Sequence, residues 1–196
     1  MRRPWATIAL MFSAFCATAP LLGPAAHADE AAALAALRQG GHVALMRHTD
    51  APGGAGDPPG FTLEDCATQR NLSDRGRRDA GAIGQRLKAA DITFAKVLSS
   101  PWCRCLDTAR LMQAGNVEIA QTVSNAFAQR DRREALTEGA RQIVAGWRGP
   151  GSLLIVTHGA NIQPLVGYNP REGEIVVVPG GGADVREVGR IAPPSR

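Results

Sequence analysis

The sequence predicts a single α/β domain of three layers, α/β/α, in which a doubly wound and mostly parallel sheet lies between helices. Short apolar runs that suit buried strands alternate along the chain with longer segments whose apolar residues have helical spacing. No internal repeat and no linker interrupts this alternation. The length of 196 residues is that of about one domain, and a composition of 44% hydrophobic and 20% charged residues is sufficient for a packed core.

The first 28 residues have the pattern of an export signal. Positive Met1-Arg2-Arg3 is followed by an apolar or small segment from Trp5 to Leu22, and Ala26-His27-Ala28 has the small-x-small form of a cleavage site. We therefore expect a signal peptide over residues 1–28, a mature chain that begins at Asp29, and a periplasmic or secreted protein of the bacterial envelope. The alternative is that the apolar segment is retained as a membrane anchor.

The corrected charge and the low aromatic content argue against some classes of partner. The formal net charge is +4, and loss of residues 1–28 would remove Arg2 and Arg3 but no acid, which lowers the charge to +2. Aromatic residues make up only 5% of the chain, which argues against a surface that stacks nucleic-acid bases. We expect no nucleic-acid partner and, after cleavage, no stable insertion into a membrane.

We expect the domain to span residues 29–191. Its N-terminal half begins with a helix over residues 30–38, which Asp29 caps. The apolar run 43–46 follows a pair of glycines and suits a strand buried on both faces. A loop rich in Gly, Pro and Asp comes next, from residue 50 to residue 60. Ser73 then caps a second helix, which the apolar spacing extends to about residue 90.

The C-terminal half continues the alternation. A strand at 95–98 leads to a helix that Pro101 opens, and a weaker strand is expected at 117–119. A long helix over 130–147 precedes the clearest central strand, 153–156. The segments 174–178 and 185–188, on either side of a glycine-rich turn, predict a terminal hairpin. The tail, residues 192–196, is expected to be disordered.

Three cysteines remain after the expected cleavage, namely Cys66, Cys103 and Cys105. An oxidising compartment favours a disulfide, and an odd number leaves one thiol free. Cys103 and Cys105 lie two residues apart in a predicted helix, so their side chains diverge and Cys66 is expected to pair with one of them. A zinc site is the alternative, but the sequence has no second Cys or His pair at ligand spacing, so we expect no metal.

Histidine and arginine side chains follow the three strong strands. Arg47-His48 comes after the first, Arg104 after the second, and His158 after the strand at 153–156. In open α/β sheets the carboxyl ends of parallel strands form the ligand-binding edge, so these four side chains should meet there. Guanidinium groups neutralise phosphoryl oxygens, and a neutral imidazole can attack phosphorus. The sequence therefore predicts a phosphoryl-binding site.

These segments resemble the histidine phosphatase superfamily, also called the phosphoglycerate mutase-like family. Leu45-Met46-Arg47-His48-Thr49 is similar to its Arg-His-Gly signature, with Thr49 in place of glycine. Asn71-Leu72-Ser73-Asp74-Arg75-Gly76 resembles the helix start that follows, Leu-(Thr/Ser)-x-x-Gly. The segment from Ser99 to Ala109 resembles Ser-x-x-x-Arg-x-x-x-Thr-Ala, and Val156-Thr157-His158-Gly159 resembles the segment with the second histidine. The similarity extends from residue 41 to residue 167.

The resemblance implies hydrolysis of a phosphomonoester in two steps through a phosphohistidine on His48. Arg47, Arg104 and His158 would hold the phosphoryl oxygens. Further substrate contacts are expected at Gly159, Asn71 and Asn161. The alternatives are that Asn71 is a helix-entry residue and that Asn161 caps the backbone of its helix. The substrate would be a small phosphorylated molecule or an envelope sugar phosphate, and no cofactor is expected because the arginines supply the positive charge.

The resemblance does not extend to the general acid. Many members carry a carboxylate after the third strand, often as Leu-x-Glu, whereas residues 123–127 read Val-Ser-Asn-Ala-Phe. Asp131 is the first candidate by its position in the chain, and the alternatives are Glu134, Asp57, Glu64 and Asp65. Members without this acid act on phosphates with good leaving groups. A second hypothesis is a catalytically silent phosphate-binding module of the envelope that has lost its acid.

Overall fold

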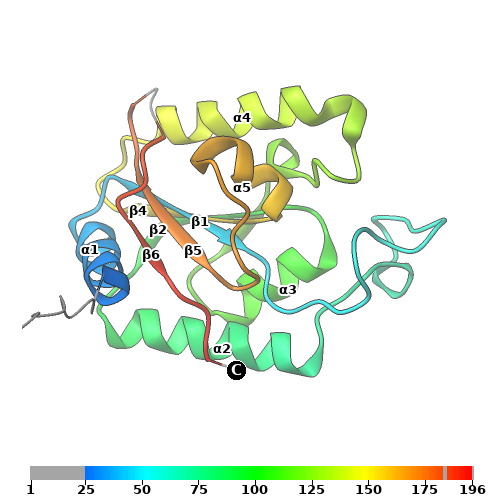
Figure 1. Cartoon of the computed structure of the whole chain (residues 1–196), viewed down its shortest axis with the longest axis horizontal. Helices are drawn as coiled ribbons and strands as arrows, with labels where there is room; N and C mark the ends of the chain where they lie inside the picture. The colour runs from blue at the N-terminus through cyan, green and yellow to red at the C-terminus, as the bar shows by residue number, and fades with distance from the viewer. Residues whose placement is uncertain (1–24, 183–184, 196) are drawn as a thin grey trace, which may run out of the picture.

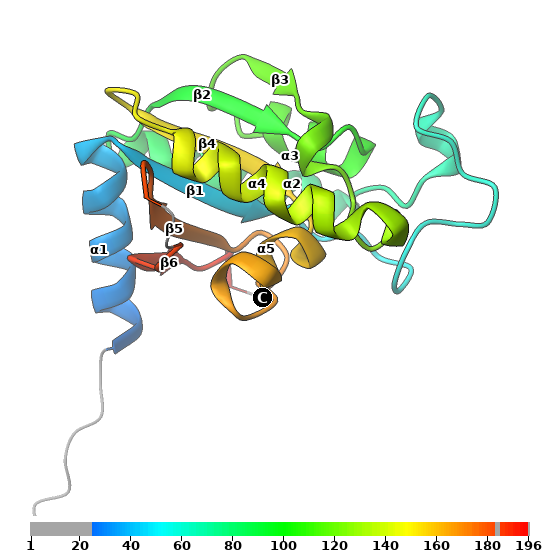
Figure 2. The same cartoon turned by 90° about the horizontal axis from the view of Figure 1, so that it is seen from above.

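The computed structural model describes residues 25–182 and 185–195. Its centre is a six-stranded sheet with the strand order β3-β2-β4-β1-β5-β6, and helices cover both faces (Figures 1 and 2). The α/β/α fold class is therefore confirmed. Residues 1–24 of the expected signal peptide lie outside the described residues. Within the described part of the chain, no helix has the length and apolar character needed to cross a membrane.

The four parallel strands are those that the apolar runs predict. They are β1 (His42–Arg47), β2 (Phe94–Ser99), β3 (Val117–Ile119) and β4 (Ser152–Thr157). β4 lies between β1 and β2, with Met46 opposite Val156 and Leu98 opposite Ile155. Every residue of β4 is buried, as expected for a strand covered on both faces.

Two antiparallel strands complete the sheet next to β1. β5 (Ile175–Pro179) pairs with β1, and β6 (Gly189–Ile191) pairs with β5. The predicted hairpin is present, but its second strand was placed too early, at 185–188. The backbone N–H groups of Gly180 and Gly181 bond to Gly41 and Val144 elsewhere in the domain, so the chain returns to β5 only at Val188.

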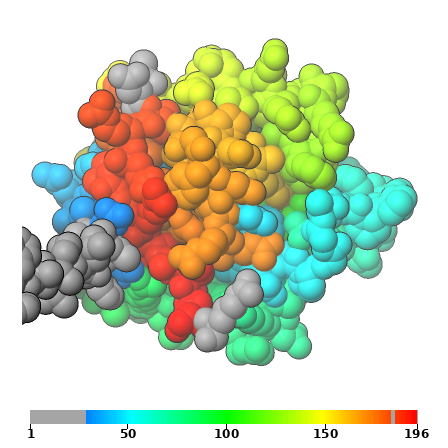
Figure 3. All heavy atoms as spheres, in the orientation of Figure 1, coloured from blue at the N-terminus to red at the C-terminus, as the bar shows by residue number. Residues whose placement is uncertain are grey.

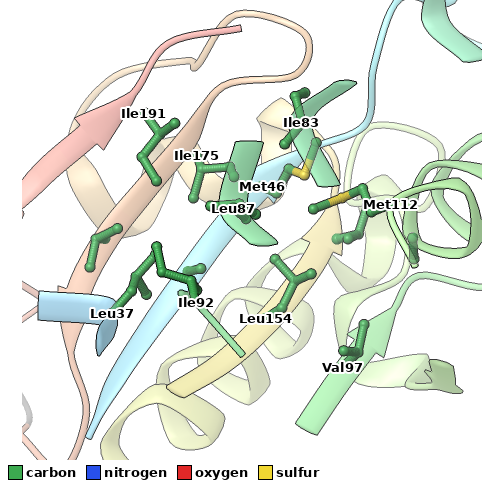
Figure 4. Packing of buried hydrophobic residues seen from close by; sticks show 14 of the residues in the cluster. Leu37, Met46, Ile83, Leu87, Ile92, Val97, Met112, Leu154, Ile175 and Ile191 are labelled. Carbon is green, nitrogen blue, oxygen red and sulfur yellow. The ribbon is translucent and has the colours of Figure 1, made fainter. Parts of the chain in front are cut away.

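The two faces of the sheet have separate hydrophobic cores. One face packs against α1 (Ala25–Gln39), α2 (Asp74–Ala89) and α3 (Cys103–Leu111), and its cluster includes Met46, Leu87 and Leu154 (Figure 4). The opposite face packs against α4 (Arg133–Gly146) and α5 (Gly159–Val166). Successive side chains of β1 alternate between the two clusters, as the pleat requires.

Some helix boundaries differ from the prediction. α1 begins at Ala25, so Asp29 lies inside the helix; the alanine-rich sequence before it favours helix, which explains the earlier start. α3 begins at Cys103 rather than at Pro101, and a 3-10 turn, η3 (Arg130–Arg132), precedes α4. Two further 3-10 turns are η1 (Cys66–Thr68) and η2 (Gln121–Val123). Residues 192–195 have neither helix nor strand, and Arg86 donates a hydrogen bond to the carbonyl of Ala192.

The predicted cap of α2 is present and fixes the loop before it. Ser73 precedes the helix, and its hydroxyl accepts a hydrogen bond from the backbone N–H of Gly76 at 2.9 Å. The loop between β1 and α2 projects from one end of the molecule (Figures 1, 2 and 3). The chain leaves β1 towards β2 and leaves β4 towards β5, which lie on opposite sides, so the carboxyl ends of β1 and β4 form a topological switch point.

Candidate active site

A cavity of about 300 Å³ lies at the carboxyl ends of the central strands. Its wall combines residues at the ends of β1 and β4 and at the start of α5 with one residue of α3 and parts of three loops. The residues that line it include Arg47, His48, Arg70, Arg104, His158 and Gly159. The structure therefore brings the predicted histidines and arginines to one cavity.

His48 is the first residue after β1, and its ring is held in one orientation. Its backbone N–H donates to the carbonyl of Thr157 at 3.0 Å, and its Nδ1 lies 2.9 Å from the carbonyl of Thr49. A carbonyl only accepts, so Nδ1 carries the hydrogen and Nε2 keeps its lone pair. Burial, and then the charge of Arg104, lower the pKa of His48 well below its usual value. His48 is thus a neutral imidazole, the form that acts as a nucleophile.

His158 lies across the cavity from His48. The two ring centroids are 5.4 Å apart, and the His158 Nε2 is 3.0 Å from the hydroxyl of Ser100. Burial, followed by the charge of Arg104, also lowers the pKa of His158 well below its usual value. Gly159 begins α5 beside it, and a Cβ there would lie only 1.9 Å from Oδ1 of Asn169. The amino end of α5 therefore faces the cavity at a position where glycine is required.

Three arginines line the cavity, one more than the sequence indicated. The Nε atoms of Arg47, Arg70 and Arg104 are all buried and have no hydrogen-bond partner among the described residues. Unpaired buried donors are rare because they lose their water without replacement. Three of them around one cavity fit a ligand with several anionic oxygens. Arg70 was not predicted as a site residue, although it directly precedes the segment that begins at Asn71.

Two acids lie beside these arginines: Glu172 pairs with Arg47 and Arg70, and Asp57 pairs with Arg104. The carboxylate of Asp57 contacts both terminal nitrogens of Arg104, at 2.6 and 3.3 Å, and accepts hydrogen bonds from the indole of Trp102 and the backbone of Arg70. Burial opposes its ionisation, but the hydrogen bonds and charge of Arg104 outweigh burial and hold the pKa of Asp57 below its usual value. Asp57 is therefore an ionised carboxylate with both oxygens occupied.

The other candidate acids lie elsewhere. Asp131 is exposed in η3 and lines a separate surface cavity with Glu134 and neighbouring arginines. Asp65 caps η1 by accepting a hydrogen bond from the backbone N–H of Ala67, and Glu64 beside it is exposed. None of these carboxylates is among the residues that line the cavity with His48. The structure does not bring Asp131, the first candidate, to the phosphoryl site.

The two predicted asparagine contacts point away from the cavity. Asn71 donates to the backbone carbonyls of Cys66 and Gln69. Asn161 donates to the carbonyl of Ser124 and accepts from the backbone N–H of Ala126, so it shapes the loop after η2. In that loop, Asn125 and Phe127 line the cavity, at the chain position where the family pattern leads one to look for an acid.

The structure resolves the choice between the cysteines. Cys66 forms a disulfide with Cys103, which joins η1 to the first residue of α3. Cys105 is free and buried, with its sulfur 3.5 Å from the His158 Nε2. Burial raises the pKa of Cys105 to about 12, so the group beside His158 is a neutral thiol.

The chain is similar to known phosphatases in sequence and in fold. The family model described as "Histidine phosphatase superfamily (branch 1)" matches residues 44–132. The putative phosphohistidine phosphatase SixA from Agrobacterium tumefaciens has a similar structure, with a TM-score of 0.56, 18% identity, and coverage of 78% of this chain and 98% of SixA. The structure of a protein histidine phosphatase SixA complexed with tungstate has a TM-score of 0.56 and 17% identity. The match covers 77% of this chain and 96% of that one.

A mycobacterial glucosyl-3-phosphoglycerate phosphatase gives a TM-score of 0.53 at 16% identity, with 74% of this chain and 95% of that chain covered. No curated protein sequence matches the chain. The solved structures have low identity and support the fold. The matched segment contains Arg47, His48 and Arg104, and the shared fold places His158 opposite His48. Residues 44–132 of this chain are thus similar to the histidine phosphatase superfamily, and the chain has the fold of the phosphatases named above.

Proposed function

We propose that the protein is an exported phosphatase that hydrolyses phosphomonoesters through a phosphohistidine on His48. The observation that carries this proposal is the neutral imidazole of His48 in a cavity with three unpaired arginine Nε groups. These donors are arranged before substrate binds, so they stabilise developing negative charge without reorganisation.

In the first step, the Nε2 lone pair of His48 forms a bond to phosphorus while the bond from phosphorus to the leaving oxygen breaks. The leaving oxygen takes the bonding electrons and then a proton from solvent water. Arg47, Arg70 and Arg104 contact the non-bridging oxygens as their charge redistributes. In the second step, water attacks phosphorus and releases a proton to solvent, and the P–N bond breaks with its electron pair returning to Nε2. Inorganic phosphate departs and His48 returns to its neutral form.

The acid–base character of the cavity bears on the leaving group. Asp57 is ionised and hydrogen-bonded to Arg104, and the nearby loop supplies Asn125 and Phe127. These side chains supply no carboxylic acid that would protonate an alkoxide. We therefore expect aryl phosphates, whose leaving oxygens depart unprotonated, to react faster than sugar phosphates.

For the natural substrate we propose a small phosphorylated molecule or an envelope sugar phosphate. The names of the similar structures refer to phosphohistidine and to glucosyl-3-phosphoglycerate, so the fold accommodates different leaving groups. A screen of sugar phosphates, acyl phosphates and phosphohistidine at equal concentration would rank these classes by kcat/KM. Turnover of none of them would contradict this substrate class.

The experiment that tests the activity is hydrolysis of p-nitrophenyl phosphate, with trapping of the labelled phosphoenzyme. His48→Ala should lower kcat by at least about 10³-fold and abolish the label, because it removes the nucleophile. His42→Ala is the control, since His42 lies at the opposite end of β1 and bonds to the carbonyl of Gly40. Phosphate binding without turnover in the unaltered protein would favour the silent phosphate-binding module instead.

Export is supported by the N-terminal pattern and by the disulfide, a bond that persists in oxidising compartments. Mass spectrometry of the protein from the periplasmic fraction should find a chain that begins at Asp29. A chain that begins at Met1 would contradict cleavage, and recovery of the protein from the cytosol would contradict export.

A further inference from the structure

We propose that Asp57 is a positioning residue that orients the guanidinium of Arg104 and leaves one edge of it open for the phosphoryl group. This inference rests on the proposed function, because it assigns Arg104 to the phosphoryl oxygens. It concerns an acid in the loop between β1 and α2, at a distance of 47 residues along the chain from its partner.

The five N–H groups of Arg104 divide into used and unused donors. Nη1 donates to Oδ1 of Asp57 at 2.6 Å and to the carbonyl of Arg70 at 3.1 Å. Nη2 donates to Oδ2 of Asp57 at 3.3 Å. One N–H of Nη2 and the N–H of Nε remain, and Nε is buried without a partner in the described part of the chain. These two lie on the same edge of the planar group, which forms a fork for two phosphoryl oxygens.

The carboxylate of Asp57 is itself fixed. Oδ1 accepts a hydrogen bond from the backbone N–H of Arg70 at 3.1 Å, and Oδ2 accepts one from the indole N–H of Trp102 at 2.9 Å. The side chains of Asp57 and Arg104 are 0% and 1% exposed. Rotation of the buried carboxylate would break several of these bonds at once. Asp57 therefore holds Arg104 to the loop that carries Arg70.

The charge of Asp57 also limits the repulsion among the arginines. Burial first, and then the charge of Arg104, lower the pKa of Arg70, whereas Glu172 and Asp57 act in the opposite direction. Without the Asp57 carboxylate, the Nη1 and Nη2 groups that now bond to it would be free to turn towards any anion. We therefore expect its loss to misorient Arg104 in the transition state more than it weakens binding of inorganic phosphate.

Asp57→Asn removes the charge and one acceptor while keeping the size of the side chain. We expect kcat to fall about 10–100-fold, with a smaller change in KM, because the lost contact is one that orients a group in the transition state. The loss should be equal, within about threefold, for p-nitrophenyl phosphate and glucose 6-phosphate. The control is Asp65→Asn, the same chemical change in the same loop at an exposed cap, which should leave both rates unchanged.

Two kinetic outcomes would overturn the proposal. A loss confined to glucose 6-phosphate would make Asp57 the general acid, because only a poor leaving group needs protonation. Unchanged kinetics for both substrates would show that Arg104 needs no carboxylate. Thermal melting of Asp57→Asn and Asp65→Asn separates these outcomes from unfolding.

A structure of the unaltered protein with tungstate tests the geometry without any variant and without turnover. Tungstate oxygens should contact Nε and Nη2 of Arg104 while the Asp57 pair stays intact. Tungstate that displaces Asp57 from Arg104, or that fails to bind in this cavity, would contradict the proposal. If tungstate binds as expected but the protein neither turns over nor forms phosphohistidine, the proposed function fails and the positioning role of Asp57 stands.

Discussion

At the scale of single residues, the site depends on which side chains are charged. His48 and His158 are buried as neutral imidazoles, whereas Arg104 and Asp57 are buried as an ion pair. Positions directly after strands were predictable, because the sheet edge dictates where His48 and His158 meet. Arg70 and Asp57 were not predictable as partners of Arg104, because hydrogen bonds to side chains distant in the sequence, rather than a periodic pattern, set the geometry of their loop.

The lowered pKa values of the two histidines determine the direction in which the free energy of unfolding changes with pH. An unfolded histidine binds a proton below about pH 6.5, whereas folded His48 and His158 remain neutral to a lower pH. The unfolded state then binds more protons, so the free energy of unfolding should fall as the pH drops from 6.5. Urea unfolding at several pH values measures this. The same shift should place below pH 6.5 the fall in kcat/KM that protonation of His48 causes. A fall centred above pH 6.5 would contradict this expectation.

Arg70 should contribute to catalysis through its planar fork and not through charge alone. Arg70→Lys keeps the charge but removes the unpaired Nε donor, so we expect kcat/KM for p-nitrophenyl phosphate to fall about 10–100-fold. Arg77→Lys is the control, because Arg77 is exposed and pairs with Asp107 on the outer side of α2 and α3. Equal rates for the two variants would remove Arg70 from the site.

At the scale of elements, apolar runs predicted β1 and β4 well, because strands buried on both faces have few polar interruptions. Boundaries set by tertiary contacts were less predictable. β6 starts late because the turn after β5 bonds to Gly41 and Val144, neither of which is near it in the sequence. α1 starts early because its first turn has no residue that stops a helix.

The start of α2 should be intolerant of even a methyl group. A Cβ at Gly76 would lie 2.2 Å from the backbone carbonyl oxygen of Asp50, whereas a Cβ at Gly81 in the same helix meets nothing within 4 Å. Gly76→Ala should therefore destabilise the protein by about 1–3 kcal/mol. Gly81→Ala should stabilise it by about 0.5–1 kcal/mol, because alanine is the better helix former. Thermal melting compares the two, and a neutral Gly76→Ala would contradict the close approach.

The disulfide should hold the loop between β1 and α2 against α3. Cys66→Ser frees η1 from the residue that precedes Arg104, and loss of a native disulfide costs about 2–5 kcal/mol. We expect a lower melting temperature and weaker phosphate binding in Cys66→Ser. Dithiothreitol should have the same effect on the unaltered protein and none on the variant. A response of the variant to the reductant would assign the effect to another group.

At the scale of the whole molecule, the fold class followed from the alternation of strand and helix patterns, and the structure confirmed it. The strand order was not predictable from those patterns, because it depends on which helix crosses which face. That order places β1 and β4 side by side, and thereby places His48 opposite His158. Two residues separated by 110 positions in the sequence become neighbours through this one pairing.

The same strand order has a consequence for the behaviour of the protein in a crowded compartment. Both outermost strands, β3 and β6, have only three residues, and α1 packs beside β6. At the other edge, β3 carries Glu118 in an ion pair with Lys96 of β2. Short and charged edges offer few free backbone groups to a strand from another molecule. The sheet therefore ends in borders that resist edge-to-edge aggregation.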